Sequence, residues 1–387
     1  MANTTATTAA TEKRHASVVI VGGGVIGCAT AYYLAKRGMK DVLVLESNEI
    51  GHGGSSRNGG GVRQSARDVR ELPLAMYAVA NMWPTLSEEL GGDTEYTQKG
   101  NLRLGKTEAH LKTLAGQVEK STKVGLDVRM ISGDEARELC PQMSHTVIGA
   151  SWCPTDGHAN PLTTTLAFYR RALQLGVTFV TGVEATGLRK VHGRARVVET
   201  TDGDYEGDQI VLAAGWWSRG IANTVGIDIP MERQFSEVLV TEMEPNMFPM
   251  MLGTAEADFY GHQTHHGSFV MGGSSGIEPF ASNKDRFANN PLTAPCISRG
   301  IIKYFPILEN AKIVRTWAGI MDMCKDGVPV IDNVKEVPGL TLACAFTGHG
   351  FGISPAVGLT VSELVLDGAA RTIDISQLKY DRFTAKA

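Results

Sequence analysis

One glycine-rich segment places the strongest constraint on how this chain can fold. Residues 18–21 form a short apolar run, long enough for one buried parallel strand, and the run ends in GGGVIG. This segment fits the pattern G-x-G-x-x-G. Its first glycine allows a tight turn, its second lets the backbone approach a pyrophosphate, and its third lets a helix pack against the sheet. Gly22, Gly24 and Gly27 occupy those three positions.

The residues after this pattern complete a β-α-β unit. We predict a helix over residues 25–36, ended by Gly38, and a second strand over residues 42–45 that Glu46 closes. The N-terminus of such a helix attracts phosphate, and an acidic residue ending the second strand can accept hydrogen bonds from both ribose hydroxyls. A dinucleotide site is therefore predicted, with a simple glycine-rich turn as the alternative. The unit alone does not distinguish NAD from FAD.

The composition limits the class of protein. A chain of 387 residues, 43% of them hydrophobic, can bury a large core, which suggests two domains or one large α/β unit. Its net charge of −4 argues against a nucleic-acid binder, and its six scattered cysteines argue against disulfides. Residues 1–14 are small and polar, which predicts a disordered tail without a secretory signal. No apolar run is long enough to span a membrane, so we expect a cytoplasmic protein.

A loop rich in glycine and hydrogen-bond donors follows Glu46. A simple NAD-binding unit has little use for such a loop, whereas in a flavin enzyme it can wrap the pyrophosphate and reach the isoalloxazine ring. A flexible surface loop is the alternative. The residues of this loop that we expect to contact a cofactor are Ser55, Ser56, Arg57, Asn58 and Gly61.

The far end of the chain carries a second glycine loop. Residues 340–345 read as a strand, residues 348–352 as the loop, and a helix is expected after Pro355. Between the two loops, residues 210–215 read as a buried strand ending in Ala-Gly, which suits a close cofactor or merely a core turn. Glycine loops at opposite ends of one chain favour FAD, whose two halves need separate supports.

Four motifs give the chain a family resemblance. They are VVIVGGGVIG with Glu46, GGSSRNGGGVRQ, QIVLAAGWWS, and WAGIMDMCKDGVPVID paired with FTGHGFGISPAVG. Over residues 15–375 the chain resembles the flavin-dependent amino-acid and amine oxidoreductases, which include D-amino-acid oxidase, glycine oxidase and sarcosine oxidase. The stretches DGHANP and GGGVRQ look most like the β subunits of multi-subunit sarcosine, proline, hydroxyproline and opine oxidising enzymes.

The resemblance implies an α/β fold whose second domain is α+β. A discontinuous, Rossmann-like FAD-binding domain is expected over residues 15–92, 149–231 and 324–380. A substrate domain with a mixed, largely antiparallel sheet is expected over residues 93–148 and 232–323. Within this frame, the apolar stripe after the first loop predicts one helix over residues 69–90.

The resemblance also implies which residues form the site. Arg63 corresponds to an arginine near flavin and substrate, and Tyr260 lies in the strand that lines the substrate cavity. His349 lies inside the second glycine loop, and these three are the candidate catalytic residues. The candidate FAD contacts are Gly22, Gly24, Val25, Ile26, Gly27, Glu46, Ser47, Ser55, Ser56, Arg57, Asn58, Gly61, Val183, Ala214, Gly215, Trp217, Gly348, Gly350, Phe351, Gly352 and Ile353.

Four departures from the family pattern carry information. Thr316 stands where monomeric sarcosine oxidases attach FAD through a cysteine, so a noncovalent FAD is expected. Residues 268–272 contain no lysine of the kind that promotes oxygen reduction, and Gly352 replaces a substrate-binding lysine. Pro161 stands near a histidine that anchors FMN in one β subunit, which leaves only a noncovalent FMN at a subunit interface open.

The expected reaction is FAD-dependent oxidation of a small amino acid or secondary amine to the imine. A planar guanidinium pairs well with a carboxylate, so Arg63 suits the substrate's acid group, although a phosphate or structural carboxylate would suit it equally. Because the lysine that promotes oxygen reduction is absent, we expect a dehydrogenase that passes electrons to partner subunits. The alternatives are a self-sufficient oxidase that makes hydrogen peroxide, a non-catalytic electron-transfer subunit, and an NAD-linked dehydrogenase.

A metal site is not expected. His262 and His266 would share one face of a strand, but no cysteine or acid cluster completes a ligand set. We therefore interpret both as polar residues of a hairpin. Asp156 and His158 have no evident chemical partner in the sequence.

Overall fold

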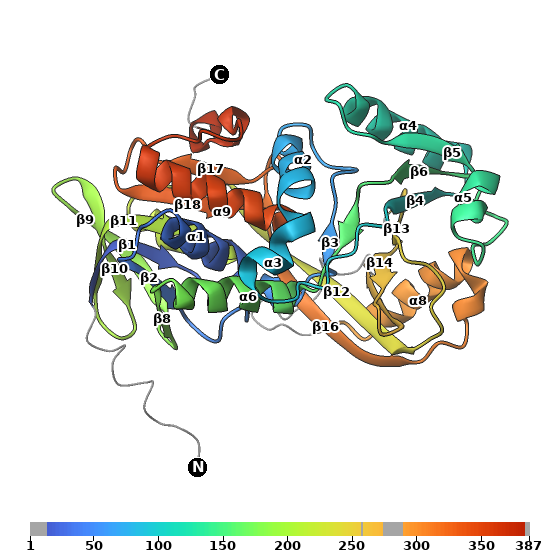
Figure 1. Cartoon of the computed structure of the whole chain (residues 1–387), viewed down its shortest axis with the longest axis horizontal. Helices are drawn as coiled ribbons and strands as arrows, with labels where there is room; N and C mark the ends of the chain where they lie inside the picture. Colours follow the sequence, from blue (N-terminus) through green and yellow to red (C-terminus); the bar gives the residue numbers. More distant parts are fainter. Residues whose placement is uncertain (1–13, 257, 274–288, 384–387) are drawn as a thin grey trace, which may run out of the picture.

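Two β-sheets, each with its own helices, lie side by side in this chain (Figure 1). The computed structural model describes residues 14–256, 258–273 and 289–383. The predicted tail lies outside the described residues, apart from Arg14. No helix in the described part of the chain combines the length and apolar character that a membrane crossing requires.

The first sheet has the strand order β17-β18-β11-β1-β2-β8. Strands β18, β11, β1, β2 and β8 run parallel, β17 joins as an antiparallel edge, and a β9–β10 ribbon extends β11. The strands are β1 (His15–Val21), β2 (Val42–Glu46), β8 (Thr178–Thr181), β9 (Ala185–Val191), β10 (Arg194–Thr200), β11 (Tyr205–Leu212), β17 (Val330–Asn333) and β18 (Leu340–Cys344).

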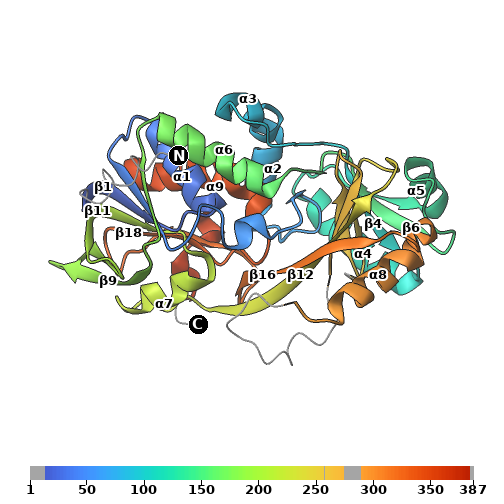
Figure 2. The same ribbon diagram turned by 90° about the horizontal axis from the view of Figure 1, so that it is seen from below.

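Helices α1, α6 and α9 cover one face of this sheet, and the β9–β10 ribbon with α7 lies on the other (Figure 2). Alternate residues of β1 point to opposite faces of the sheet. Val18 and Ile20 pack against the helices, while Val19 and Val21 belong to the hydrophobic core on the other face. Helix α1 packs against both α6 and α9, so its side chains are buried nearly all round. The helices are α1 (Val25–Lys36), α6 (Pro161–Gln174), α7 (Ser218–Asn223) and α9 (Gly350–Asp367).

The second sheet has the order β16-β12-β15-β14-β13-β4-β6-β5, and all its pairs are antiparallel except β13 with β4. The predicted mixed, largely antiparallel sheet is thereby confirmed. The strands are β4 (Asn101–Gly105), β5 (Arg129–Ser132), β6 (Gly149–Cys153), β12 (Met231–Met243), β13 (Met251–Thr254), β14 (Tyr260–Gln263), β15 (Ser268–Gly273) and β16 (Ile313–Cys324).

One face of the second sheet packs against helices and the other faces the first domain. Leu104, Leu252 and Phe269 form a core with α8, and α4 and α5 pack against the β4–β6 end. These helices are α4 (Glu108–Thr122), α5 (Gly133–Leu139) and α8 (Thr293–Tyr304). Two long paired strands, β12 and β16, run from this sheet toward the first domain (Figure 2). A short β3–β7 ladder (Gly61–Val62 with Gly157–His158) lies where the two domains meet.

Three sequence predictions about elements need correction, and the first concerns the helix over residues 69–90. It is broken into α2 (Leu72–Asn81), a 3-10 turn (Trp83–Thr85) and α3 (Leu86–Leu90). Pro73 favours the first turn of α2, and Pro84 has no N–H to continue a helix, so the chain turns at both prolines.

The other two corrections concern α9 and β6. Helix α9 begins at Gly350 rather than after Pro355, which lies inside it. Pro355 costs the helix only one N–H donor, so the helix can continue through it. In the same turn, Trp83 Nε1 donates a hydrogen bond to the Gly352 carbonyl (2.7 Å). Strand β6 pairs with β4 and β5, so residues 149–153 belong to the second sheet and not to the FAD-binding domain as predicted.

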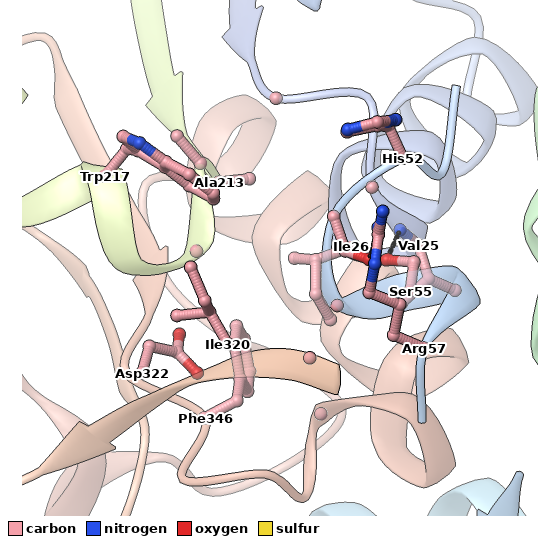
Figure 3. A pocket seen from close by; sticks show the side chains of 18 of the residues that line it. Val25, Ile26, His52, Ser55, Arg57, Ala213, Trp217, Ile320, Asp322 and Phe346 are labelled. Atoms are coloured by element: carbon pink, nitrogen blue, oxygen red, sulfur yellow. Dashed lines mark hydrogen bonds between the residues drawn. The ribbon is translucent and has the colours of Figure 1, made fainter. Parts of the chain in front are cut away.

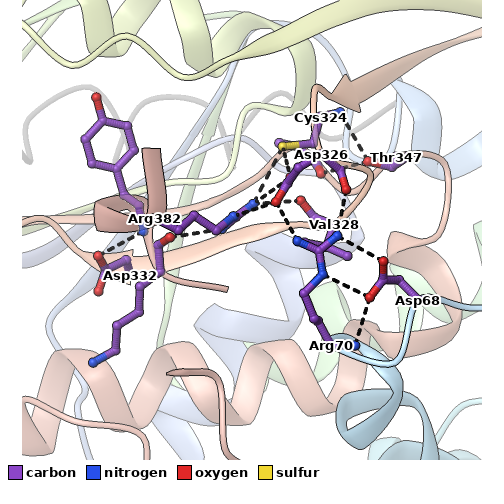
Figure 4. A network of polar contacts seen from close by, with 11 residues as sticks. Asp68, Arg70, Cys324, Asp326, Val328, Asp332, Thr347 and Arg382 are labelled. Carbon is purple, nitrogen blue, oxygen red and sulfur yellow. Dashed lines mark hydrogen bonds and ion pairs between the residues drawn. The ribbon is translucent and has the colours of Figure 1, made fainter. Parts of the chain in front are cut away.

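A polar network fixes the C-terminal segment to the first domain (Figure 4). Asp326 Oδ2 accepts hydrogen bonds from Arg70 (2.7 Å) and Arg382 (3.0 Å), and Arg70 also binds Asp68 (2.9 Å). Partial burial alone would raise the pKa of Asp326, but the hydrogen bonds from Arg382, Cys324 and Arg70 lower it to about 2. The network therefore joins the segment before α2, the β16–β17 turn and the C-terminus.

This network makes a prediction about stability and pH. A carboxylate with a lowered pKa adds stability above its unfolded pKa of about 4, and this stability is lost as the pH falls toward 2. Asp326→Asn should lower the free energy of urea unfolding at pH 7, and its deficit relative to the wild type should shrink between pH 4 and pH 2. Asp127→Asn, at an exposed position, is the matched control. A deficit that stays constant down to pH 2 would contradict the role assigned to the Asp326 charge.

Candidate functional site

A cavity of about 410 Å³ lies at the C-terminal ends of β1 and β2 and extends to the second domain. Val25, Ile26, Ser55 and Arg57 form one wall, with Ala213 and Trp217 across from them (Figure 3). Ile320, Asp322 and Phe346 line a third side. The ends of parallel strands are where α/β sheets usually bind ligands.

The glycines of the first loop are required by close backbone contacts. Gly22 has φ +111°, and a Cβ there would lie 2.4 Å from the Ala213 carbonyl oxygen. A Cβ on Gly27 would lie 1.9 Å from the Gly22 carbonyl oxygen, so only glycine lets α1 start this close to the turn. A Cβ on Gly24 would lie 3.0 Å from Ser55 Oγ, which lines the cavity.

Two helices point their N-termini at this cavity. Gly24 at the start of α1 and His349 at the start of α9 make no side-chain capping hydrogen bond. The first residues of both helices line the cavity. Because the first turn of a helix has unpaired N–H donors and the positive end of the dipole, each end can bind an anionic or electron-rich group.

The donor-rich loop encloses the cavity rather than lying free on the surface. Ser55 Oγ accepts a hydrogen bond from Val25 N (2.8 Å), which ties the loop to the start of α1. Asn58 donates to the carbonyls of Gly54 and Ser55 (3.2 and 3.0 Å) and accepts from Gly60 N (2.9 Å). Trp317 of β16 donates to the Arg57 carbonyl (3.0 Å), so both domains hold this loop.

The structure brings most of the predicted cofactor residues to this one cavity. Glu46 lies at its rim, where its carboxylate accepts hydrogen bonds from Gly23 N (2.7 Å) and Asn48 N (2.9 Å). The predicted residues that line the cavity are Gly22, Gly24, Val25, Ile26, Glu46, Ser47, Ser55, Arg57, Asn58, Val183, Ala214, Gly215, Trp217, Tyr260, Gly348, Gly350 and Phe351.

Other predicted residues lie behind the wall. Gly27 supports Gly22, and Gly352 packs against Gly61, since a Cβ on Gly352 would lie 2.9 Å from the Gly61 carbonyl oxygen. Ile353 is fully buried in the core beside α1. Ser56, Arg63 and His349 are also outside the lining.

Several lining residues were not singled out in the sequence. His52, Ser236, Ile320, Asp322 and Phe346 line the cavity from the first loop, β12, β16 and the end of β18. Burial raises the pKa of Asp322 to about 6, against opposing backbone hydrogen bonds at Phe346 and Ala345. The motif that contains Asp322 was visible in the sequence, but nothing in its pattern shows which of its residues face inward.

Tyr260 closes the end of the cavity nearest the second domain. Its hydroxyl lies 3.4 Å from Ser236 Oγ. Two glycines make room for its ring: a Cβ on Gly59 would lie 3.0 Å from its Cε2, and a Cβ on Gly272 would lie 2.4 Å from its Cζ. The ring is therefore held between the first-domain loop and β15.

Arg63 follows β3 and lies close to Tyr260. The only hydrogen bond of its guanidinium in the described residues is a long one from Nη1 to the Ser65 carbonyl (3.4 Å), and no ion pair joins it to a described carboxylate. A Cβ on Gly61 would lie 3.4 Å from both Arg63 Nε and Met251 Cε, so Arg63 and β13 both approach β3 at this glycine. Burial lowers the pKa of Arg63, and so does the charge of Arg67.

A second arginine beside it, Arg67, is paired with a carboxylate of the protein. Arg67 and Glu71 form an ion pair (Nη1–Oε1 3.3 Å) in which both side chains are almost completely buried. Arg67 Nη2 also donates to the His349 carbonyl (3.0 Å), and His349 Nδ1 lies 2.9 Å from Glu71 Oε1. Burial alone would raise the pKa of Glu71, but the charge of Arg67 and the hydrogen bond from His349 lower it.

His349 is held as a neutral imidazole. Burial lowers its pKa, the hydrogen bond to Glu71 opposes this, and the charges of Arg67 and Arg63 lower it further. Because Glu71 is an ionised acceptor, Nδ1 must carry the proton that bridges them. The other ring nitrogen, Nε2, then keeps its lone pair.

Asp156 was the main residue that the sequence left unexplained. It is completely buried and accepts hydrogen bonds from Gln64 N (2.6 Å), Ser65 Oγ (2.5 Å) and Asn101 Nδ2 (3.4 Å). It therefore fixes the segment that carries Arg63 against β4 of the second sheet. No sequence signal marked this role, because the donors are far apart along the chain.

The expectation that His262 and His266 share one face of a strand was wrong. Strand β14 ends at Gln263, so His266 lies in the following turn, whereas His262 is buried and stacks on His158 with ring centroids 3.9 Å apart. Burial lowers the pKa of His158 to about 4 and that of His262 well below its usual value. No group of three or more potential metal-ligating side chains occurs in the described residues.

Comparisons with known proteins agree with this geometry. Residues 17–364 match the family described as FAD dependent oxidoreductase. Sarcosine oxidase subunit beta from Arthrobacter sp is 29% identical over 94% of this chain and 90% of that protein. The crystal structure of L-proline dehydrogenase from P. horikoshii has a TM-score of 0.88 at 30% identity, covering 96% of this chain and 98% of the other. Glycine oxidase from Geobacillus kaustophilus shares the fold, with a TM-score of 0.87 at 24% identity over 96% of this chain and 99% of the other.

The cavity fits the FAD that this family uses. It offers two helix N-termini, a carboxylate at the end of β2, and glycines where any side chain would collide with the wall. Gly24 and Val25 would hold the pyrophosphate, Glu46 the ribose, and the residues from Gly348 to Phe351 the electron-rich edge of the flavin. The cofactor is FAD.

The glycine contacts predict how FAD binding responds to one added methyl group. Gly27→Ala forces α1 away from the Gly22 carbonyl, so FAD affinity should fall at least tenfold, measured from the flavin absorbance of the purified protein and by titration with FAD. Gly220→Ala is the matched control, because this exposed glycine of α7 has open space around its Cβ position. Full FAD occupancy in Gly27→Ala would refute the close-contact argument.

Proposed function

Because this chain belongs to the family of FAD dependent oxidoreductases, we propose that it oxidises a small amino acid or secondary amine, of the sarcosine, proline or opine type, to the imine. The observation that carries the proposal is Arg63, an enclosed guanidinium beside Tyr260 with no carboxylate partner in the described residues. An unpaired buried cation is costly, and a substrate carboxylate would remove that cost. Sarcosine oxidase subunit beta and L-proline dehydrogenase, named above, act on substrates of this class.

In this proposal the protein binds and orients the substrate, and noncovalent FAD, when bound, would supply the acceptor for a hydride from the carbon next to nitrogen. Arg63 binds the substrate carboxylate through two parallel hydrogen bonds, and the Tyr260 hydroxyl donates a further one. The ring of Tyr260 between Gly59 and Gly272 keeps this end of the cavity narrow and excludes water. The imine leaves the site and is hydrolysed in water.

His349 is proposed as the group that accepts the amine proton. Amino acids enter as ammonium ions, and the nitrogen must lose a proton before its lone pair can assist loss of the hydride. His349 Nε2 has a free lone pair because Nδ1 is bonded to Glu71. The negative Glu71 stabilises the imidazolium that forms when the proton moves to Nε2.

We further propose that electrons leave the flavin for partner subunits rather than for oxygen. The strand β15, which contacts Tyr260, has no lysine, and the subunit name of the Arthrobacter relative supports a heteromeric assembly. Oxygen as acceptor would make the chain a self-sufficient oxidase, and an inert flavin would make it an electron-transfer subunit. The experiment below separates these outcomes.

The test is anaerobic reduction of the FAD-loaded protein. We expect sarcosine, proline, 4-hydroxyproline or an opine to bleach the flavin absorbance, with little hydrogen peroxide formed when air is admitted. Arg63→Met should weaken the apparent substrate affinity at least tenfold, because the carboxylate loses its guanidinium. Arg37→Met, in a surface ion pair with Asp367, is the matched control.

The possible results are distinct. Bleaching by none of these amines, alone or with partner subunits, would overturn the proposed substrate class. Rapid peroxide formation would keep the substrate class and replace the dehydrogenase with an oxidase. A normal substrate affinity in Arg63→Met would remove the assigned role of Arg63.

The proton-acceptor role predicts a pH profile. The pKa of His349 is lowered, so in the wild type kcat/KM should be level from neutral pH up to the pKa of the amine and fall only in acid. In His349→Gln the substrate must arrive already deprotonated, so kcat/KM should rise about tenfold per pH unit over the same range. Identical profiles for the two proteins would contradict this role.

A further inference from the structure

Another arginine, Arg103, lies on the same face of the second sheet as Tyr260. Arg103 of β4 pairs with Gly253 of β13, and Gly253 pairs with Tyr260 of β14. Residues directly opposite one another in a ladder point to the same face. At about 4.8 Å per strand, the backbones of Arg103 and Tyr260 are about 10 Å apart.

No side chain stands between these two residues, because Gly253 occupies the strand between them. A Cβ on Gly253 would meet only Arg103 Cγ, at 3.8 Å. Arg63 Nε and Met251 Cε, two residues before Gly253 on the same strand, would each lie 3.4 Å from a Cβ on Gly61. The face therefore carries Tyr260, an open position at Gly253 and then Arg103, with Arg63 beside them.

Arg103 has few protein partners for a group so enclosed. Nη2 donates to the Thr254 carbonyl (3.1 Å), Nε is shielded from solvent without a partner, and no ion pair joins Arg103 to a carboxylate in the residues described. Burial and the positive charge of Arg63 lower the pKa of Arg103 to about 10, although the negative charge of Asp156 opposes this shift.

The nearby acids each have other partners, although Glu71 Oε2 is buried without a hydrogen bond. Glu71 is paired with Arg67 and His349. Asp156 is surrounded by the Gln64, Ser65 and Asn101 donors. Two guanidiniums, Arg63 and Arg103, therefore share one region without a carboxylate of their own, which is unfavourable unless an anion joins them.

We propose that the substrate of this site carries two carboxylates, as in an amino acid whose nitrogen bears a carboxyalkyl arm. This inference rests on the proposed function and specifies its substrate class. Arg63 binds the carboxylate of the carbon that is oxidised, and Arg103 binds the carboxylate at the end of the arm. The nitrogen lies between them, over Gly253 and near Tyr260.

Two simpler roles for Arg103 make different predictions. If both arginines bound one carboxylate, removing Arg103 would weaken ligands with one and with two carboxylates to the same degree. If Arg103 only supported the Thr254 carbonyl, its removal would lower stability without changing selectivity. A comparison of matched ligands separates the three roles.

The test uses oxydiacetate and methoxyacetate, ether analogues that differ by one carboxylate and offer no amine to oxidise. Their affinities for the FAD-loaded protein are measured by calorimetry. We expect oxydiacetate to bind at least tenfold more tightly, since a charged hydrogen-bonded pair contributes about that much. Arg103→Met should bring this ratio close to one, and Arg103→Lys should restore part of it because the charge remains. Arg129→Met, an exposed arginine of β5, should keep the full ratio.

The outcomes distinguish this inference from the proposed function. Equal binding of the two analogues by the wild type, or an unchanged ratio in Arg103→Met, would overturn the two-carboxylate site even if sarcosine or proline bleaches the flavin. If the affinity ratios are as expected but neither iminodiacetate nor any other amine bleaches the flavin, the two-carboxylate site is supported. The proposed oxidation of amines is then overturned. The flavin content and the thermal unfolding of each variant are measured as well. They show whether a change in the affinity ratio comes from unfolding of the variant.

Discussion

The buried ion pair of Arg67 and Glu71 is the interaction on which the arrangement of this site depends. Arg67 donates to the backbone of both Arg63 and His349, and Glu71 accepts from the His349 ring. One pair therefore connects the segment after β3 to the start of α9. Removing one partner of such a pair costs about 3–5 kcal/mol, because the other is left as an unpaired buried charge. The pair also makes Arg63 available to a ligand, since its neighbour takes the nearby acid.

The arrangement of the site also depends on the alternation of side chains between the two faces of the second sheet. Leu102, Leu104 and Leu252 point to the helices and form the core, so the intervening residues must point to the first domain. Asn101 and Arg103 reach that domain by this alternation. A strand register shifted by one residue would bury the arginine against α8 and expose the leucines, so packing of the core fixes the polar face as well.

The cofactor end could be predicted from sequence because its signals are local. Strand, glycine loop, helix and acid follow one another within residues 18–46, and each has its own spacing rule. Gly348 and Gly350 of the second predicted glycine loop line the same cavity, although the start of the following helix was misplaced because of Pro355. Trp83, which supports that turn, is far away along the chain.

The substrate end could be predicted only in part, because its contacts join distant segments. Tyr260 was chosen by resemblance and does line the cavity. Glu71, Arg103 and Asp156 gave no signal, since each depends on which strands pair and on which face a residue lies. The single expected helix over 69–90 concealed Glu71, which immediately precedes α2 and ends the loop after Arg63. Local propensity does not determine such pairings; the packed sheets do.

The three arginines near Tyr260 show how a folded chain can separate structural from binding charges. Arg67 has its charge matched by Glu71, and its Nε and Nη2 atoms donate to backbone carbonyls. Arg63 and Arg103 have one backbone acceptor each. The chain tolerates the two unmatched charges because Asp156 and Glu71 lie close enough to moderate them without pairing directly. A direct acid partner would make the fold more stable and would compete with an anionic ligand for the same guanidinium. The stability given up at these two positions is therefore available as binding energy for a carboxylate.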